Sequence, residues 1–201
     1  MSAFTWPPDA RPSAAADQVP AAVLVPLFMP AAASEAHVVF TRRRADLRRH
    51  AGEISFPGGR QDAEDATLTD TALREAEEEI GLARAQVSLL GELPPTSTFA
   101  TNYVIHPFVA TIPAGLTWRP SAKEVDAVLE LPLPALRSGR TRTRLERRGI
   151  SFETDAYVVD GHLIWGATAR ILAHLLERLD TSPADGGAAF ELRSSGPDRS
   201  S

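Results

Sequence analysis

The segment from Thr67 to Leu82 constrains the fold more than any other part of this chain. Its apolar residues recur at helical spacing, which indicates a helix. Glycine is favoured just beyond the end of a helix, so the helix is predicted to end near Gly81. At about 100° per residue, the apolar side chains form one narrow stripe. The stripe consists of Ala72, Leu73, Ala76 and Ile80.

Three carboxylates lie beside that stripe on the predicted helix. Glu75, Glu78 and Glu79 stand at spacings i, i+3 and i+4, whereas Glu77 lies apart, nearer Arg74. Most acidic runs are simply solvated helix faces. Like charges at these spacings repel, however, and the helix dipole disfavours anions toward the C-terminal end. A divalent cation would remove both penalties, and Mg²⁺ suits a site of carboxylates, waters and substrate phosphates. The helix alone leaves both interpretations open.

The rest of the chain predicts strands with a few helices. Strand-like runs cover residues 22–28, 37–40, 54–56, 87–93, 104–111, 125–131, 150–159 and 163–165. A short helical turn is expected over residues 133–136 and a last helix over residues 167–179. Pro57-Gly58-Gly59 is expected to end a strand, and its backbone can approach a ligand without obstruction by a side chain. This mixture predicts an α/β layered domain.

The termini and the composition narrow the class of protein. We expect residues 1–20 to be a mobile N-terminal arm and residues 181–201 a flexible C-terminal tail, around one domain over residues 21–180. The 201 residues include no cysteine, which excludes disulfides, thiolate metal sites and cysteine nucleophiles. The 21 basic and 26 acidic residues give a net charge of -5, which argues against a nucleic-acid partner bound through a basic surface.

The sequence also argues against a membrane partner. The most apolar run, residues 21–33, is interrupted by Pro26 and Pro30 and falls short of the roughly 20 residues that a spanning helix needs. The first residues lack the basic start and apolar stretch of a signal peptide. A cytoplasmic location is therefore the expectation.

The helix and the glycines before it resemble the sequence motif of the Nudix hydrolase family, G-x5-E-x7-R-E-U-x-E-E-x-G-U, in which U is aliphatic. The run Arg74-Glu75-Ala76-Glu77-Glu78-Glu79-Ile80-Gly81-Leu82 matches the last nine positions in full. The front half differs. Counted from Gly59, the acidic position is Asp65 instead of glutamate, and eight residues instead of seven precede Arg74.

This resemblance implies a fold, a reaction and a cofactor. The fold is the Nudix-type α/β/α sandwich with a mixed β-sheet, over residues 21–180. The reaction is hydrolysis of a nucleoside diphosphate linked to another moiety. The expected cofactor is Mg²⁺ or Mn²⁺, with Glu75, Glu78 and Glu79 as its ligands.

A second stretch, residues 40–59, is similar to the motif that precedes the box in the coenzyme A pyrophosphatase subfamily. Residues 71–75 and 164–169 also resemble that subfamily. The resemblance implies hydrolysis of coenzyme A or its thioesters to adenosine 3′,5′-bisphosphate and 4′-phosphopantetheine. The same chemistry on ADP-ribose, dinucleotides or nucleoside triphosphates is the alternative, and a non-catalytic nucleotide-binding sensor is a third hypothesis. The intact carboxylates argue against the sensor, because a sensor does not need a metal-binding face.

The arginines of the second stretch are expected to contact phosphate. Coenzyme A carries a 3′-phosphate besides its diphosphate, and arginine binds phosphate bidentately. One or two of Arg42, Arg43, Arg44, Arg48 and Arg49 are expected to do so, with the others as solvated loop charge. The substrate-binding candidates are Arg42, Arg44, Arg48, His50, Gly58 and Gly59.

Other residues have candidate roles in the reaction or beside it. Glu124 precedes a predicted strand, where many Nudix enzymes place a further glutamate, and it is a general base, an extra ligand or a surface residue. Glu78 and Glu124 are the catalytic candidates. Arg74 is expected to orient neighbouring carboxylates. Tyr157 and Trp165 are aromatic residues for which core packing is favoured over stacking on adenine.

Overall fold

A computed structural model describes residues 18–46, 52–98, 102–147 and 149–181 of the chain. Its elements are β1 Val19–Phe28, β2 His37–Arg43, β3 Ile54–Ser55, β4 Gly58–Arg60, α1 Leu68–Ile80, the 3-10 helix η1 Arg84–Gln86, β5 Ser88–Glu92, β6 Thr96–Ser97, β7 Tyr103–Thr111, β8 Val125–Pro132, α2 Leu133–Ser138, β9 Arg140–Arg147, β10 Ile150–Val159, β11 His162–Trp165 and α3 Gly166–Thr181. Every strand and helix predicted from the sequence is present. The sequence does not predict β4, β6, β9 or η1.

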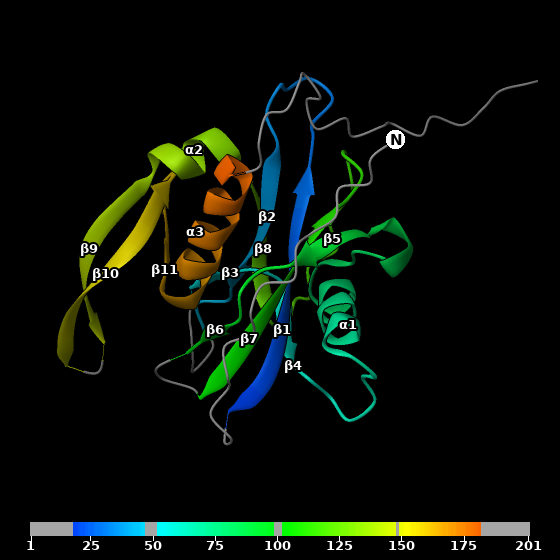
Figure 1. Cartoon of the computed structure of the whole chain (residues 1–201), viewed down its shortest axis with the longest axis horizontal. Coiled ribbons are helices and arrows are strands. Elements are labelled where there is room, and N and C mark those ends of the chain that lie inside the picture. The colour runs from blue at the N-terminus through cyan, green and yellow to red at the C-terminus, as the bar shows by residue number, and fades with distance from the viewer. Residues whose placement is uncertain (1–17, 47–51, 99–101, 148, 182–201) are drawn as a thin grey trace, which may run out of the picture.

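An eight-stranded mixed sheet forms the centre of the molecule (Figure 1). Its main path runs β3-β2-β1-β7-β5, with β4 paired to β1, β8 to β2 and β6 to β7. β1 and β7 are parallel from the Val19–Tyr103 pair to the Leu27–Thr111 pair, and the other described pairs of this sheet are antiparallel. Residues 21–28 of β1 are buried without alternation, as expected for a strand covered on both faces.

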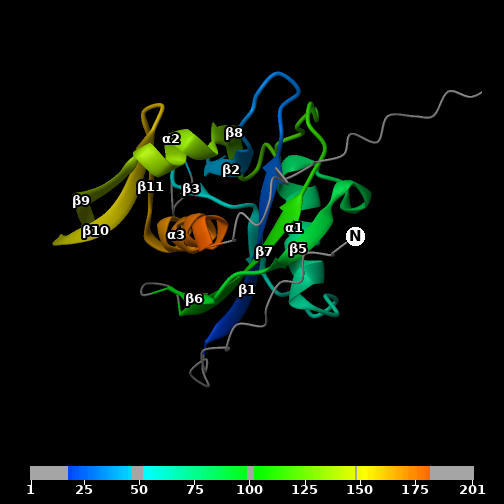
Figure 2. The same ribbon diagram turned by 45° about the horizontal axis from the view of Figure 1, so that its top comes forward.

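Helices α1 and α3 cover opposite faces of this sheet (Figures 1 and 2). The core under α1 includes Ala22, Leu24, Val39, Ala72, Leu73, Ala76 and Ile80. The core under α3 includes Val25, Val38, Phe40, Ile171, Leu172 and Leu175. Alternate residues of β1 and β2 therefore point to different helices. The expected α/β/α sandwich with a mixed sheet is confirmed.

A second sheet, β11-β10-β9, lies beside α3 at the edge of the molecule (Figure 1). β9 and β10 form a long hairpin whose register runs from the Arg147–Ile150 pair to the Arg140–Tyr157 pair. Arginine alternates with threonine in the first part of β9. Because such a strand lacks large apolar side chains, the sequence gives no strand signal there.

Both ends of α1 are fixed by local contacts. The Thr67 hydroxyl accepts a hydrogen bond from the backbone N–H of Asp70 over 3.1 Å and so caps the first turn. Gly81 adopts the left-handed conformation, with φ of 71°, and its N–H donates to the carbonyl of Glu77 over 3.0 Å. The helix therefore begins and ends where the sequence predicts.

The predicted strand end implies that Pro57-Gly58-Gly59 leaves the sheet. In the structure these residues stay with it. β3 ends at Ser55, but the chain pairs again as β4, with Gly58 opposite Val23 and Gly59 opposite Ala22. A Cβ at Gly58 would lie 2.3 Å from the backbone oxygen of Ala22. Because Gly58 has no side chain, β4 can lie against β1.

The predicted domain boundaries need one correction. β1 begins at Val19, so residues 19 and 20 belong to the sheet and not to an N-terminal arm. Most of the predicted arm and tail lies outside the described residues. Among the described helices, none is long and apolar enough to cross a membrane.

Candidate active site

Strand β4 lies in direct contact with the acidic helix. A Cβ added to Gly59 would stand 2.3 Å from Oε1 of Glu75, so the backbone and that carboxylate pack together only because position 59 is glycine. One residue earlier, the N–H of Gly58 donates to Oε2 of Glu79 over 3.2 Å. The two glycines predicted to contact substrate therefore lie against two of the predicted metal ligands.

These two carboxylates are buried to different degrees. Glu79 is only 6% exposed, and this burial raises its pKa to about 8, although the Gly58 N–H and the charge of Arg43 act in the opposite direction. Burial also raises the pKa of Glu75, against the lowering effect of Arg74. Carboxylates in such surroundings are ionised at a cost unless a positive charge lies close by. The pair therefore favours a cation.

Arg74 contacts the third predicted ligand. Its Nη1 donates to Oε1 of Glu75 over 3.1 Å and to Oε2 of Glu78 over 3.2 Å, which are the contacts that an arginine orienting neighbouring carboxylates would make. The Glu78 side chain is 60% exposed. The three glutamates predicted to share one face are thus in two environments, with Glu75 and Glu79 against β4 and Glu78 toward solvent.

Asp65 holds Arg74 from the other side. Its Oδ1 accepts from Nε of Arg74 over 3.0 Å, and its Oδ2 accepts from Nη2 over 2.9 Å. The Thr71 hydroxyl and the backbone N–H of Asp62 also donate to Oδ2, each over 2.9 Å. These bonds, and the bonds to Arg74 most of all, hold the pKa of Asp65 well below its ordinary value. The acidic residue of the motif's front half therefore positions the arginine.

Replacing Asp65 by asparagine should destabilise the protein in a pH-dependent way. We expect the free energy of unfolding at pH 7 to fall by about 2 kcal/mol, because the charged hydrogen bonds to Arg74 are lost. A carboxylate with a lowered folded pKa contributes stability above its unfolded pKa and loses that contribution as the pH falls. The difference between Asp65→Asn and the wild type should therefore shrink as the pH falls below about 4. Denaturant unfolding across pH tests this, and a constant difference would contradict it. Asp62→Asn, which removes an exposed partner 3.7 Å from Arg74, is the control.

Glu124, the residue before β8, lies close to the acidic helix. It is 52% exposed, and its Oε2 lies 3.5 Å from Nη2 of Arg43. Its negative charge contributes to the raised pKa of both Glu75 and Glu79. We call Glu75, Glu78, Glu79 and Glu124 the carboxylate cluster. Glu124 is thus close enough to the acidic helix for its charge to act on two of the predicted ligands.

The described arginines of residues 40–59 have different partners. Arg42 donates from Nε to Asp126 over 2.8 Å, and Arg44 donates from Nε to Asp46 over 2.9 Å. Arg43, which was not among the three arginines favoured from the sequence, is the described arginine of this stretch whose side chain pairs with the carboxylate cluster. The alternation of β2 is a signal that could have found it, because Thr41 and Arg43 share the face of the buried Val39.

The other predicted residues lie elsewhere or outside the described chain. Arg48 and His50 are not among the described residues. Tyr157 is buried in the core under α3, as core packing predicts. Trp165 is half-buried, and its ring centroid lies 6.2 Å from that of Phe152.

Comparison with known proteins identifies the family. The family model described as NUDIX domain matches residues 19–149. This chain belongs to the Nudix family. The match spans β1 through β9 and so includes the whole carboxylate cluster of this Nudix protein. Nudix hydrolases act on diphosphate bonds of small nucleoside diphosphate substrates, and the chain is an enzyme of this kind.

Relatives and solved structures agree with this assignment. The Nudix hydrolase NudL of Salmonella paratyphi B is 38% identical over 169 residues, which are 83% of this chain and 86% of NudL. The Nudix hydrolase RenU of M. smegmatis has a similar fold, with a TM-score of 0.58 and 16% identity, over 83% of this chain and 88% of RenU. The NUDIX domain of Shewanella oneidensis NrtR, solved with ADP ribose, has a TM-score of 0.53 and 15% identity over 85% and 94% of the two chains.

Nudix hydrolases generally use divalent ions such as Mg²⁺ or Mn²⁺. Among the described residues, no three aspartate, glutamate or histidine side chains converge closely enough to hold a metal in their present positions. Glu75 and Glu79 supply the oxygen donors that such an ion prefers, and both lie against the bare backbone of β4. Glu78 would have to leave Arg74 to join them.

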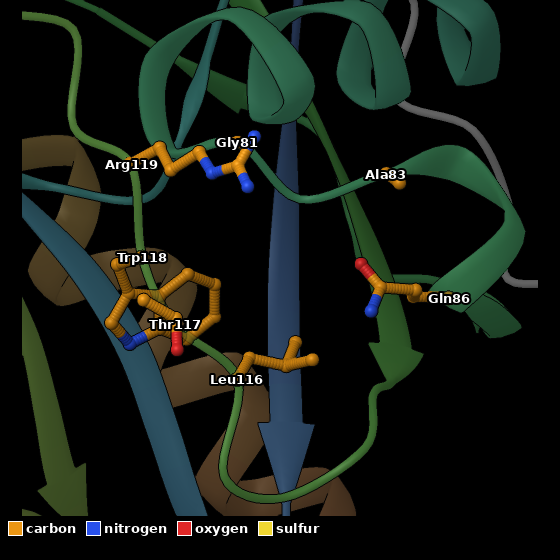
Figure 3. Close-up of a pocket in the computed structure, with 7 residues that line it drawn as sticks. All are labelled: Gly81, Ala83, Gln86, Leu116, Thr117, Trp118 and Arg119. Carbon is orange, nitrogen blue, oxygen red and sulfur yellow. The ribbon is translucent and has the colours of Figure 1, made fainter.

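A cavity of about 340 Å³ lies beyond the C-terminal end of α1 in this Nudix fold (Figure 3). Its described lining residues are Gly81, Ala83, Gln86, Leu116, Thr117, Trp118 and Arg119. None of these is a carboxylate, so the cavity is separate from the carboxylate cluster.

Proposed function

We propose that this Nudix hydrolase cleaves the diphosphate bond of coenzyme A or its thioesters, giving adenosine 3′,5′-bisphosphate and 4′-phosphopantetheine. One observation carries the proposal. Residues 40–59, the stretch similar to the coenzyme A pyrophosphatase subfamily, contribute Arg43 beside Glu124 and Gly59 against Glu75. The stretch that would recognise the substrate is therefore in contact with the carboxylates that would support its hydrolysis.

The four carboxylates of the cluster have two proposed roles. Glu75 and Glu79, with raised pKa values and against β4, would hold the ion, and Glu78 would join them. When bound, Mg²⁺ or Mn²⁺ neutralises charge on the diphosphate and makes a water molecule more acidic. Glu124 is exposed to solvent and accepts the proton of the attacking water. We assign this role to Glu124 because Glu78, the other candidate base, is proposed to join the ion as a ligand.

Arg43 is the arginine best placed to contact the diphosphate. Its Nε is buried and has no hydrogen-bond partner among the described residues. Its Nη2 lies at the cluster, 3.5 Å from Glu124. A guanidinium with an unused buried N–H donates readily to a phosphate oxygen, since charge-assisted bonds of this kind are the strong ones. The 3′-phosphate would then be bound by another arginine of the segment 42–49.

A substrate panel tests this proposal against its alternatives. We expect the kcat/KM for coenzyme A to exceed that for dephospho-coenzyme A by about tenfold to a hundredfold, because an arginine contact with the 3′-phosphate contributes about 1.5–3 kcal/mol. The measurement uses the full chain at fixed Mn²⁺ with coenzyme A, dephospho-coenzyme A, ADP-ribose, a dinucleotide and a nucleoside triphosphate.

Each other result selects a different hypothesis. Equal efficiency on coenzyme A and dephospho-coenzyme A would remove the 3′-phosphate contact. A clear preference for ADP-ribose, the ligand in the NrtR domain structure, would replace the proposed substrate. Binding of these compounds without turnover of any would favour the nucleotide sensor.

A further inference from the structure

The turn that carries Glu124 is fastened to the end of the acidic helix. The backbone N–H groups of Glu124 and Val125 both donate to the carbonyl of Ser121, over 3.0 and 2.9 Å. The N–H of Ser121 itself donates to the carbonyl of Glu79 over 2.8 Å. We call residues 121–124 the Glu124 turn. One side of this turn is therefore fixed to α1 by backbone hydrogen bonding.

Arg44 fastens the other side of the same turn. Its backbone N–H donates to the carbonyl of Glu124 over 3.0 Å. Its side chain reaches the same turn, where Nη1 donates to the carbonyl of Ala122. Arg44 thus contacts the Glu124 turn at two points, one from the backbone and one from the guanidinium.

Asp46 fixes the orientation of the Arg44 guanidinium. Oδ1 of Asp46 accepts from Nε over 2.9 Å, and Oδ2 accepts from Nη2 over 2.6 Å, so the carboxylate binds one edge of the guanidinium bidentately. The remaining Nη1 is directed at Ala122. Each nitrogen of this guanidinium therefore already has a protein acceptor, which distinguishes Arg44 from Arg43 and its buried, unpartnered Nε.

We infer that Arg44 is a positioning residue that acts on hydrolysis through Glu124, and not a substrate contact. The inference rests on the role proposed above for Glu124. With Asp46 fixing the guanidinium, Arg44 holds the Glu124 turn at the end of α1, where the Ser121 N–H bonds to the Glu79 carbonyl and Glu124 lies beside Arg43. Because small displacements of a reacting group lower the rate of a step without weakening ground-state binding, the loss of Arg44 affects kcat more than KM.

A double-mutant cycle on the full chain tests this role. Arg44→Ala should lower kcat by about fivefold to tenfold and change KM for the best substrate of the panel by less than about twofold. In a Glu124→Gln background, Arg44→Ala should change kcat by less than about twofold, because the group through which it acts is already gone. Arg44→Lys, which keeps one donor for the Ala122 carbonyl, should recover part of the lost kcat.

Arg137→Ala is the matched control. Arg137 and Asp180 form a pair with side-chain exposures of 38% and 61%, close to the 40% and 64% of Arg44 and Asp46, but the pair joins α2 to α3 away from the cluster. We expect wild-type kcat and KM for Arg137→Ala. Thermal unfolding of each variant identifies any that fails to fold.

The outcomes separate this inference from the proposed function. A several-fold rise in KM with unchanged kcat in Arg44→Ala would make Arg44 a substrate contact. An equal loss of kcat with and without Glu124 would mean that Arg44 acts by another route. If Glu124→Gln retains wild-type kcat, the role of Glu124 is wrong and the inference fails with it, although hydrolysis by the wild type leaves the proposed reaction intact.

Discussion

Glu79→Gln should lower kcat by at least about a hundredfold while the protein stays folded. Glutamine has the shape of the protonated glutamate, and it can still accept the hydrogen bond that the Gly58 N–H gives to position 79. Its neutral amide cannot offset the charge of a divalent ion. Because burial raises the pKa of Glu79, removing this buried charge should not destabilise the metal-free protein. Steady-state kinetics at saturating Mn²⁺, together with thermal unfolding, measures both quantities.

Glu77→Gln is the matched control for this variant. Glu77 lies on the same helix but is exposed, and it is outside the carboxylate cluster. The same chemical change there should leave kcat within about twofold of the wild type. Near-normal turnover by Glu79→Gln at matched Mn²⁺ would show that the buried carboxylate does not serve the reaction. A variant that unfolds would be replaced by Glu78→Gln, whose exposed position tolerates the change and for which the same loss of kcat is expected.

Removal of divalent ions should abolish turnover altogether. Activity should return with Mg²⁺ or Mn²⁺, but not to the same level with Ca²⁺, because Ca²⁺ takes more oxygen ligands at longer distances and holds the attacking water elsewhere. Dialysis against a chelator followed by titration of each ion measures this. Full activity in excess chelator would contradict a metal-dependent reaction.

The same ions should stabilise the folded protein, which provides a measurement independent of turnover. At about 100 times its dissociation constant, Mn²⁺ should add about 2.7 kcal/mol to the free energy of unfolding. In Glu79→Gln most of that increase should disappear, whereas Glu77→Gln should keep it. An equal increase in all three proteins would mean that the ion binds outside the cluster.

Much of the fold could be predicted from the sequence, because periodicity and caps are local signals. The α1 helix is an example, since Thr67 and Gly81 at its two ends carry the capping preferences that fix its length. β4 and β9 could not be predicted in this way. β4 exists because Gly58 and Gly59 fit against β1, which is a tertiary contact. β9 carries arginine and threonine where a strand signal requires apolar side chains.

The spacing of the acidic residues could be read from the sequence, but the surroundings of each carboxylate could not. The spacing of Glu75, Glu78 and Glu79 places them together on a helix, yet it says nothing of which carboxylate the sheet buries. Of these three glutamates, Glu75 and Glu79 are the two that lie against the described backbone of β4. Similarly, the sequence offers several arginines, and it does not show which partner each will have, whereas the fold pairs Arg43 with Glu124 and Arg44 with Asp46.

The parallel pairing of β1 with β7 determines when the active site can assemble as the chain is synthesised. Among the described strands β1 leaves the ribosome first, but the edge that pairs with β7 stays open until residue 111 has followed. Until then the apolar run of β1 is an unpaired edge, a template for aggregation in a nascent chain. Pairing between strands so distant in sequence is also slow. The residues of the helix with its glutamates are therefore synthesised before the sheet that supports them is complete, and the site can form only after β7 has docked.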